Sequence, residues 1–159
     1  MIADVRTRTR AALTFASNWD RFEELRFWDA LDCIGIQAYF PLADGADPSR
    51  AVLRDAWNAR MRKLRRFAIS ARRNIVFTEL GYNRSRDAAR KPWAYETDGP
   101  ETEALQARCL SVALDAIEGE GSVLGSFLWK WFPGERAVGR NFQLATPKLL
   151  EAIEGVWRR

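Results

Sequence analysis

The stretch that decides the fold is Asn74–Ile75–Val76–Phe77–Thr78–Glu79–Leu80–Gly81–Tyr82, an apolar run that ends abruptly in a carboxylate, with a glycine two residues later. Burying an unpaired charge is unfavourable, so a glutamate that closes a buried strand needs a partner, an exit to solvent or a chemical role. In barrels of alternating strands and helices, the C-terminal strand ends form the active-site face. Glu79 is therefore a candidate acid, base or nucleophile.

Strand-like runs also occur at residues 12–17, 33–40 and 123–129. Together with residues 75–80 they are almost continuously apolar, which is typical of parallel strands covered on both faces. Helical patterns separate them: a short one after Asp20, a long one that Asp47 caps with Pro48 at its first position, one over 101–118, and one that opens at Thr146–Pro147. The alternation predicts a parallel α/β architecture.

The composition is that of one globular domain, which we expect to span residues 1–159. The 159 residues are 47% hydrophobic and 29% charged, and no apolar stretch reaches the roughly 18–20 residues that cross a bilayer. The first ten residues lack the apolar core of a secretory signal. We therefore expect no membrane partner and, by default, a cytoplasmic location.

The residue inventory excludes several chemistries. The chain has no histidine, which excludes a Ser-His-Asp triad, a Cys-His dyad and histidine-ligated zinc. Cys33 and Cys109 lack metal-binding spacing and are expected to be buried, reduced thiols. No glycine-rich phosphate loop follows any strand, which disfavours a nucleotide site. We expect neither a metal nor a cofactor.

A basic cluster accounts for much of the net charge of +4. One interpretation is a nucleic-acid surface, and the other is the solvated outer face of an amphipathic helix. We favour the second, without nucleic-acid binding, because no pattern of stacking aromatic residues accompanies the cluster. Its members are Arg60, Arg62, Lys63, Arg65, Arg66, Arg72 and Arg73.

Four blocks of sequence carry a resemblance to a known family: FASNWD at 15–20, FWDALDCIGIQAYFPL at 27–42, FTELGY at 77–82 and LWKWF at 128–132. In this order they resemble glycoside hydrolase family 113, whose members are β-mannanase-like, retaining enzymes of a (β/α)8-barrel clan. The resemblance implies the C-terminal half of a TIM barrel, with strands five to eight present and the N-terminal half absent. Residues 2–6 then resemble the tail of the preceding helix.

The resemblance also implies half of a catalytic pair. The family's nucleophile, at the end of strand seven, falls on Glu79, whereas the acid/base glutamate ends strand four, upstream of Met1. Tyr39, at the end of its strand, could hydrogen-bond the nucleophile and keep it ionised, or could be a tyrosine at the edge of the core. Three other carboxylates belong to predicted loops on the same face, but none ends a strand, so no acid/base residue is nominated: Asp20, Asp44 and Glu96.

Aromatic residues provide the expected sugar-binding surface. The family uses a tryptophan at the position of Trp129 as the floor of the cleft, although packing within the barrel would also explain it. Gln37 stands where the resemblance implies an aspartate, so a charge has been lost from the pocket. Further substrate-binding candidates are Asn18, Trp19, Lys130 and Trp131, with Trp93 weaker.

These expectations combine into a glycoside hydrolase-like protein that carries the nucleophile and lacks the acid/base residue. The alternative is a non-catalytic carbohydrate-binding or remnant half-barrel. Four strands alone expose two unpaired edges and an apolar interior, so the expected partners are a carbohydrate and either the missing N-terminal half or a second copy.

Overall fold

Four strands lie side by side in chain order and form a single parallel sheet. The computed structural model describes residues 1–132 and 140–158. Its helices are α1 (Ile2–Arg6), α2 (Arg50–Ala71), α3 (Glu103–Glu118) and α4 (Pro147–Trp157), and its strands are β1 (Ala16–Asn18), β2 (Ile34–Gln37), β3 (Ile75–Leu80) and β4 (Val123–Leu128). Short 3-10 helices span Phe22–Glu24, Trp28–Ala30, Pro100–Thr102 and Arg140–Phe142.

The strand order is β1-β2-β3-β4, and every neighbouring pair is parallel. A sheet in which each strand lies beside its predecessor, with helices between, is the arrangement of half a (β/α)8 barrel. In the register, Asn18 lies opposite Gln37, and Gln37 lies opposite Glu79. The carboxyl ends of the first three strands are therefore aligned, and the predicted fold class is confirmed.

Two strands are shorter than the sequence predicted. β1 begins at Ala16 instead of residue 12, because side chains take over the hydrogen bonds before it: Leu13 N donates to Asp32 Oδ2, and Thr14 Oγ1 donates to the Cys33 carbonyl. β2 ends at Gln37 instead of residue 40, because the Tyr39 amide turns back to the carbonyl of Gln37.

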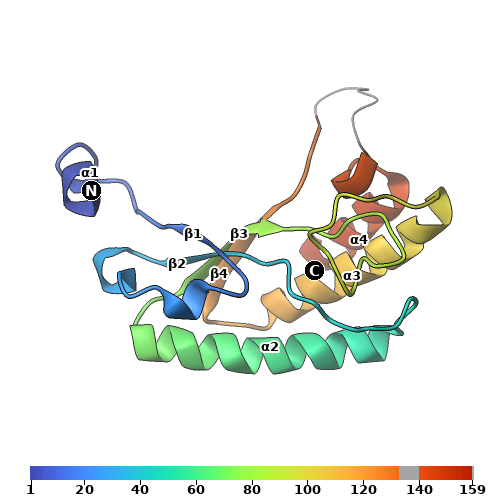
Figure 1. Cartoon of the computed structure of the whole chain (residues 1–159), viewed down its shortest axis with the longest axis horizontal. Helices are drawn as coiled ribbons and strands as arrows, with labels where there is room; N and C mark the ends of the chain where they lie inside the picture. Colours follow the sequence, from blue (N-terminus) through green and yellow to red (C-terminus); the bar gives the residue numbers. More distant parts are fainter. Residues whose placement is uncertain (133–139, 159) are drawn as a thin grey trace.

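Helices α2 and α3 pack together and bury one face of the sheet. Figure 1 shows α2 running along this face. The side of α2 toward the sheet buries five residues at helical spacing: Leu53, Trp57, Met61, Leu64 and Ala68. On β3, Ile75 and Phe77 are completely buried. Burial of apolar surface contributes about 25 cal/mol per Å², so this interface stabilises the fold.

The helix starts differ slightly from the prediction. Ser49, and not Asp47, caps α2, with its hydroxyl accepting from Val52 N, while Asp47 forms an ion pair with Arg108. A 3-10 turn precedes α3, which therefore begins at Glu103 and not at residue 101. Thr146 caps α4, as predicted.

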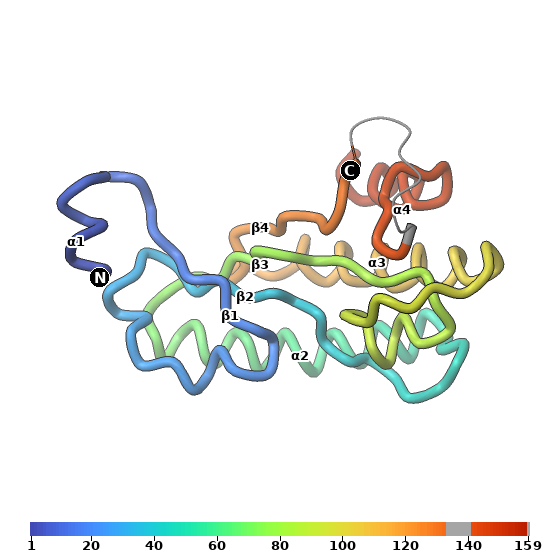
Figure 2. The backbone as a smooth tube through the Cα atoms, turned by 45° about the horizontal axis from the view of Figure 1, so that its top comes forward, coloured from blue at the N-terminus to red at the C-terminus, as the bar shows by residue number. Residues whose placement is uncertain are grey.

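Within the described parts of the chain the other face of the sheet is left open, as expected of four strands that expose an apolar interior. Leu124 and Phe127 on β4 are 63% and 68% exposed. In a whole barrel, inward side chains pack against those of the opposite strands. The apolar side chains on this face of the strands therefore match the interior packing of a whole barrel, which four strands alone do not form. Figure 2 shows α1 set apart at the β1 end of the sheet.

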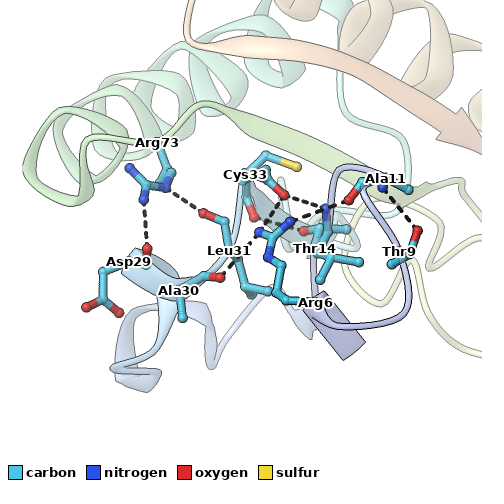
Figure 3. Close-up of polar contacts among 11 residues, drawn as sticks. Arg6, Thr9, Ala11, Thr14, Asp29, Ala30, Leu31, Cys33 and Arg73 are labelled. Carbon is cyan, nitrogen blue, oxygen red and sulfur yellow. Dashed lines mark hydrogen bonds and ion pairs between the residues drawn. The ribbon is translucent and has the colours of Figure 1, made fainter. Parts of the chain in front are cut away.

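Part of the basic cluster is structural and not simply solvated. Figure 3 shows Arg73 donating to the carbonyls of Leu31 and Asp29, with distances of 2.6 and 2.7 Å. Arg65 binds Glu120, whose side chain is 4% exposed. These arginines tie α2 and the start of β3 to neighbouring loops at the amino end of the sheet.

The cysteine prediction is half right. Both thiols are free, but Cys109 alone is buried, while Cys33 is partly exposed. Among the described helices, none is both long and apolar enough to cross a membrane.

Candidate functional site

A cavity of about 670 Å³ opens at the carboxyl ends of the strands. This volume falls within the range of about 300–1,000 Å³ that is usual for small-molecule sites. A hollow of about 580 Å³ at the opposite end of the sheet has no aromatic lining. The carboxyl-end cavity is lined by Asn18, Trp19, Asp20, Gln37, Tyr39, Glu79, Trp93, Tyr95, Trp129 and Phe142.

Both carboxylate oxygens of Glu79 accept a hydrogen bond from β2 or the residues just after it. Gln37 Nε2 donates to Oε1 and the Tyr39 hydroxyl donates to Oε2, each at 2.6 Å. An irregularity in the β2–β3 register makes this possible: Ile36 pairs with Phe77, but Gln37 pairs with Glu79, so that Thr78 is skipped. The extra residue, Thr78, changes the direction of the side chains that follow it, as β-bulges do.

Tyr39 is held as a hydrogen-bond donor. Burial, together with the hydrogen bond to Glu79 and its charge, raises the pKa of the Tyr39 phenol well above its ordinary value. The ring packs edge-to-face against Phe142, with the centroids 5.9 Å apart. A phenol that keeps its proton acts as a hydrogen-bond donor to the Glu79 carboxylate.

Trp129 follows the last residue of β4 and approaches the chain after β3 closely. Its amide donates to the Leu80 carbonyl at 2.8 Å, and a Cβ added to Gly81 would lie 2.2 Å from the Trp129 carbonyl oxygen. Glycine is therefore required at residue 81 for this approach. The Trp129–Lys130 peptide bond is cis. The indole is 37% exposed, which leaves it available to a ligand.

Six of the eight nominated site residues line the cavity: Asn18, Trp19, Gln37, Tyr39, Glu79 and Trp129. The other two do not. Lys130 holds its ammonium 5.3 Å from the Trp129 ring and 4.9 Å from the Phe132 ring, and Trp131 is 57% exposed outside the cavity. The roles assigned to all eight stay predictions.

Four more residues line the cavity, and only Trp93 among them was considered as a weaker sugar-binding candidate: Asp20, Trp93, Tyr95 and Phe142. Asp20 was recognised as a carboxylate on the correct face, and Trp93 and Tyr95 lie in the long loop between β3 and α3. Phe142 follows β4 at a distance, and no local pattern identifies it. Asp44 and Glu96, the other carboxylates considered, do not line the cavity.

Comparison with known proteins extends this picture. The sequence profile described as Glycoside Hydrolase Family 113 matches residues 1–138. The chain belongs to glycoside hydrolase family 113. No curated protein sequence matches it.

Solved GH113 structures share the fold of this chain. The GH113 β-mannanase AaManA from Alicyclobacillus acidocaldarius is 26% identical, with a TM-score of 0.76. A GH113 β-1,4-mannanase is 20% identical, with a TM-score of 0.77. In both comparisons 99% of this chain is covered, but only 48% of the other. The chain therefore spans about half the length of these GH113 enzymes.

A more distant likeness extends to another glycosidase. A β-glucuronidase from Ruminococcus gnavus is 17% identical, with a TM-score of 0.61; the match covers 99% of this chain and 28% of that one. At this identity the likeness concerns the fold alone. Within residues 1–132 and 140–158, no group of three or more carboxylate or cysteine side chains could hold a metal ion.

Proposed function

We propose that this GH113 chain carries the nucleophile half of a retaining glycosidase site of the β-mannan type. Glu79 is the nucleophile and Tyr39 and Gln37 are its positioning residues. The supporting observation is that both carboxylate oxygens of Glu79 accept 2.6 Å hydrogen bonds inside a cavity lined by aromatic rings. Hydrogen bonds to a charged group are worth about 1.5–3 kcal/mol each, so the two donors fix the position of the Glu79 side chain.

The chemistry assigns a distinct task to each side chain. The apolar face of a sugar ring stacks on Trp129, which presents the anomeric carbon to Glu79. A Glu79 oxygen forms a bond to that carbon as the bond to the leaving oxygen breaks, and the sugar becomes a covalent ester of Glu79. The leaving oxygen must receive a proton. Water later attacks the ester, and a base must remove its proton.

Asp20 is poorly placed to supply that acid and base. The two carboxyl groups of a retaining pair lie about 5–5.5 Å apart. Asp20 follows β1, and β1 is separated from β3 by β2. At about 4.8 Å per strand spacing, the two strands are roughly 9.6 Å apart. We therefore propose that the acid/base residue comes from the other half of the barrel.

An unlike half fits the open sheet better than a second copy of the chain. In a two-copy barrel, the partner's α4 would pack beside β1, since each helix covers the strand before it and the strand after it. Helix α1 precedes β1 and already lies at that end, where Met1, Ile2 and Val5 help to line an apolar hollow of about 590 Å³. The partner's α4 and the chain's own α1 would compete for one position.

An activated substrate tests the nucleophile without the acid. We expect 2,4-dinitrophenyl β-mannoside to release about one equivalent of dinitrophenolate and to leave a mannosyl adduct on Glu79, located by intact mass and peptide mapping. Glu79→Gln should abolish both signals. Glu96→Gln is the matched control, because Glu96 is exposed and does not line the cavity. Release that persists in Glu79→Gln would refute the assignment.

The second candidate is a carbohydrate-binding domain without catalysis. It is favoured by the aromatic lining of the cavity together with the absence, on the described strand ends, of a second carboxylate near enough to form a retaining pair. Sugar binding with no release and no adduct would support this candidate.

A further inference from the structure

Three aromatic rings form a continuous stack from the core to the cavity. Phe40, which is 2% exposed, meets Trp19 edge-to-face with the ring centroids 6.3 Å apart. Trp19 in turn stacks on Trp93 at 5.4 Å, with an angle of 22° between the rings. Trp93 is 40% exposed. One face of its indole is therefore supported by the protein, while the ring remains accessible from the cavity.

The loop that carries Trp93 is fixed by its own hydrogen bonds. The side chain of Asn83 is completely buried, and its Nδ2 donates to the carbonyls of Lys91 and Ala94, on either side of Trp93. Ser85 Oγ donates to Asn83 Oδ1 at 2.8 Å. A ring on such a loop loses little conformational entropy when a ligand stacks on it, which favours binding.

A carboxylate lies beside this platform. Asp20 follows Trp19 directly and lines the same cavity. Within the described parts of the chain, its side chain forms no ion pair or hydrogen bond. A carboxylate accepts hydrogen bonds through both oxygens, so an exposed Asp20 can bind two hydroxyl groups of a ligand.

We infer that Trp93 and Asp20 form a second sugar subsite, which takes a neighbouring pyranose ring of a β-linked oligosaccharide whose first ring lies over Trp129. The inference rests on the proposed function, because it assumes that the cavity accepts carbohydrate. The apolar face of the second ring stacks on the indole of Trp93, and its hydroxyl groups donate to Asp20. A cavity of about 670 Å³ has room for more than one ring.

The subsite predicts that affinity depends on the length of the sugar. The full chain is titrated with mannose and with β-1,4-mannotetraose, and binding is followed by calorimetry. We expect mannotetraose to bind at least tenfold more tightly than mannose. Trp93→Ala should weaken mannotetraose binding about tenfold, since an interface tryptophan commonly contributes more than 1 kcal/mol and 1.4 kcal/mol is a tenfold change.

Matched variants separate the subsite from a general loss of structure. Trp93→Phe should restore part of the affinity, because a flat apolar ring remains, and Asp20→Asn should weaken mannotetraose binding several-fold. Trp157→Ala removes another exposed indole, 62% accessible on α4, and should change nothing.

The outcomes distinguish the subsite from the proposed function. Equal binding of mannotetraose by Trp93→Ala and the unaltered chain overturns the subsite. Equal affinity of the unaltered chain for mannose and for mannotetraose also overturns it, even if Glu79-dependent release is intact. Length-dependent binding that requires Trp93, without any release, supports the subsite and overturns the nucleophile assignment alone.

Discussion

Tyr39 donates a 2.6 Å hydrogen bond to Oε2 of Glu79, although the two residues are 40 positions apart in sequence. The contact depends on the β2–β3 register, in which Gln37 pairs with Glu79 and the residue before Glu79 is skipped. A regular ladder would pair Gln37 with Thr78, and successive side chains of a strand point to opposite faces. The irregular register therefore decides whether the carboxylate meets its two donors.

Raising the pH should destabilise the fold. The pKa of Tyr39 is raised by burial and by Glu79, and burial raises the pKa of the Cys109 thiol from 9.0 to about 12. The unfolded chain then releases these protons at a lower pH than the folded chain. The free energy of unfolding should fall above pH 9, by at most about 1.4 kcal/mol per pH unit for each group.

Urea denaturation between pH 7 and pH 11 measures this slope. Cys109→Ala should flatten it between pH 9 and 11, and Tyr39→Phe should flatten it above pH 10, with Tyr82 providing a residual slope because its buried phenol also has a raised pKa. An unchanged slope in both variants would contradict the assignment.

Gly81→Ala should disturb the floor of the cavity. The added Cβ would lie 2.2 Å from the Trp129 carbonyl oxygen, which forces β3 and β4 apart at their carboxyl ends. Overpacking of this kind costs about 1–3 kcal/mol of stability. Gly121→Ala is the control, since a Cβ there meets nothing within 4 Å. Equal melting temperatures for the two variants would show that the close approach is not needed.

Trp57→Ala should remove much of the stability of the chain. Trp57 is completely buried, packs against Phe40 and Phe77, and donates from Nε1 to the Tyr82 hydroxyl at 3.1 Å. Truncating a buried tryptophan costs about 3–5 kcal/mol. Trp157→Ala, at an exposed site, should change the unfolding free energy by less than about 0.5 kcal/mol. Similar losses from both substitutions in chemical denaturation would contradict the burial of Trp57.

Glu120→Gln should weaken the fold at neutral pH and have less effect in acid. Arg65 and Ser122 hydrogen-bond the Glu120 carboxylate and lower its pKa from 4.5. The stabilisation is therefore present above pH 4.5 and is lost as the pH falls through the lowered value. At pH 7 we expect a loss of about 1 kcal/mol, because the Arg65 side chain is half exposed and solvent screens its attraction to Glu120. A loss that is the same at pH 3 would rule out this ionic contribution.

The strands and helices could be predicted because their patterns are local. The burial of Ile75 and Phe77, the Thr146 cap and the alternation of strand and helix all follow from spacing along the chain. The bare face of the sheet was expected only from the family resemblance, which implies half a barrel, and not from the local pattern. Leu124 and Phe127 are apolar as if covered, and the sequence pattern does not reveal that nothing described in this chain covers them.

The same difference between local and long-range patterns applies to the site residues. Glu79 could be recognised because a carboxylate that ends an apolar run is unusual, and Trp129 because of the family resemblance. The stack of Trp93 on Trp19 could not be recognised, since it joins a strand end to a loop distant in sequence and depends on how Asn83 folds that loop.

The two edges of the sheet differ, and this difference affects how the purified chain behaves. β1 has three residues and β4 has six. Natural proteins often use short edge strands to limit unwanted pairing between chains. The short β1 is therefore a poor template for pairing with another chain, whereas β4, with Phe127 exposed, is a good one. Solubility should therefore depend on one strand, and a lysine in place of Phe127 should delay precipitation of concentrated samples more than any change to β1.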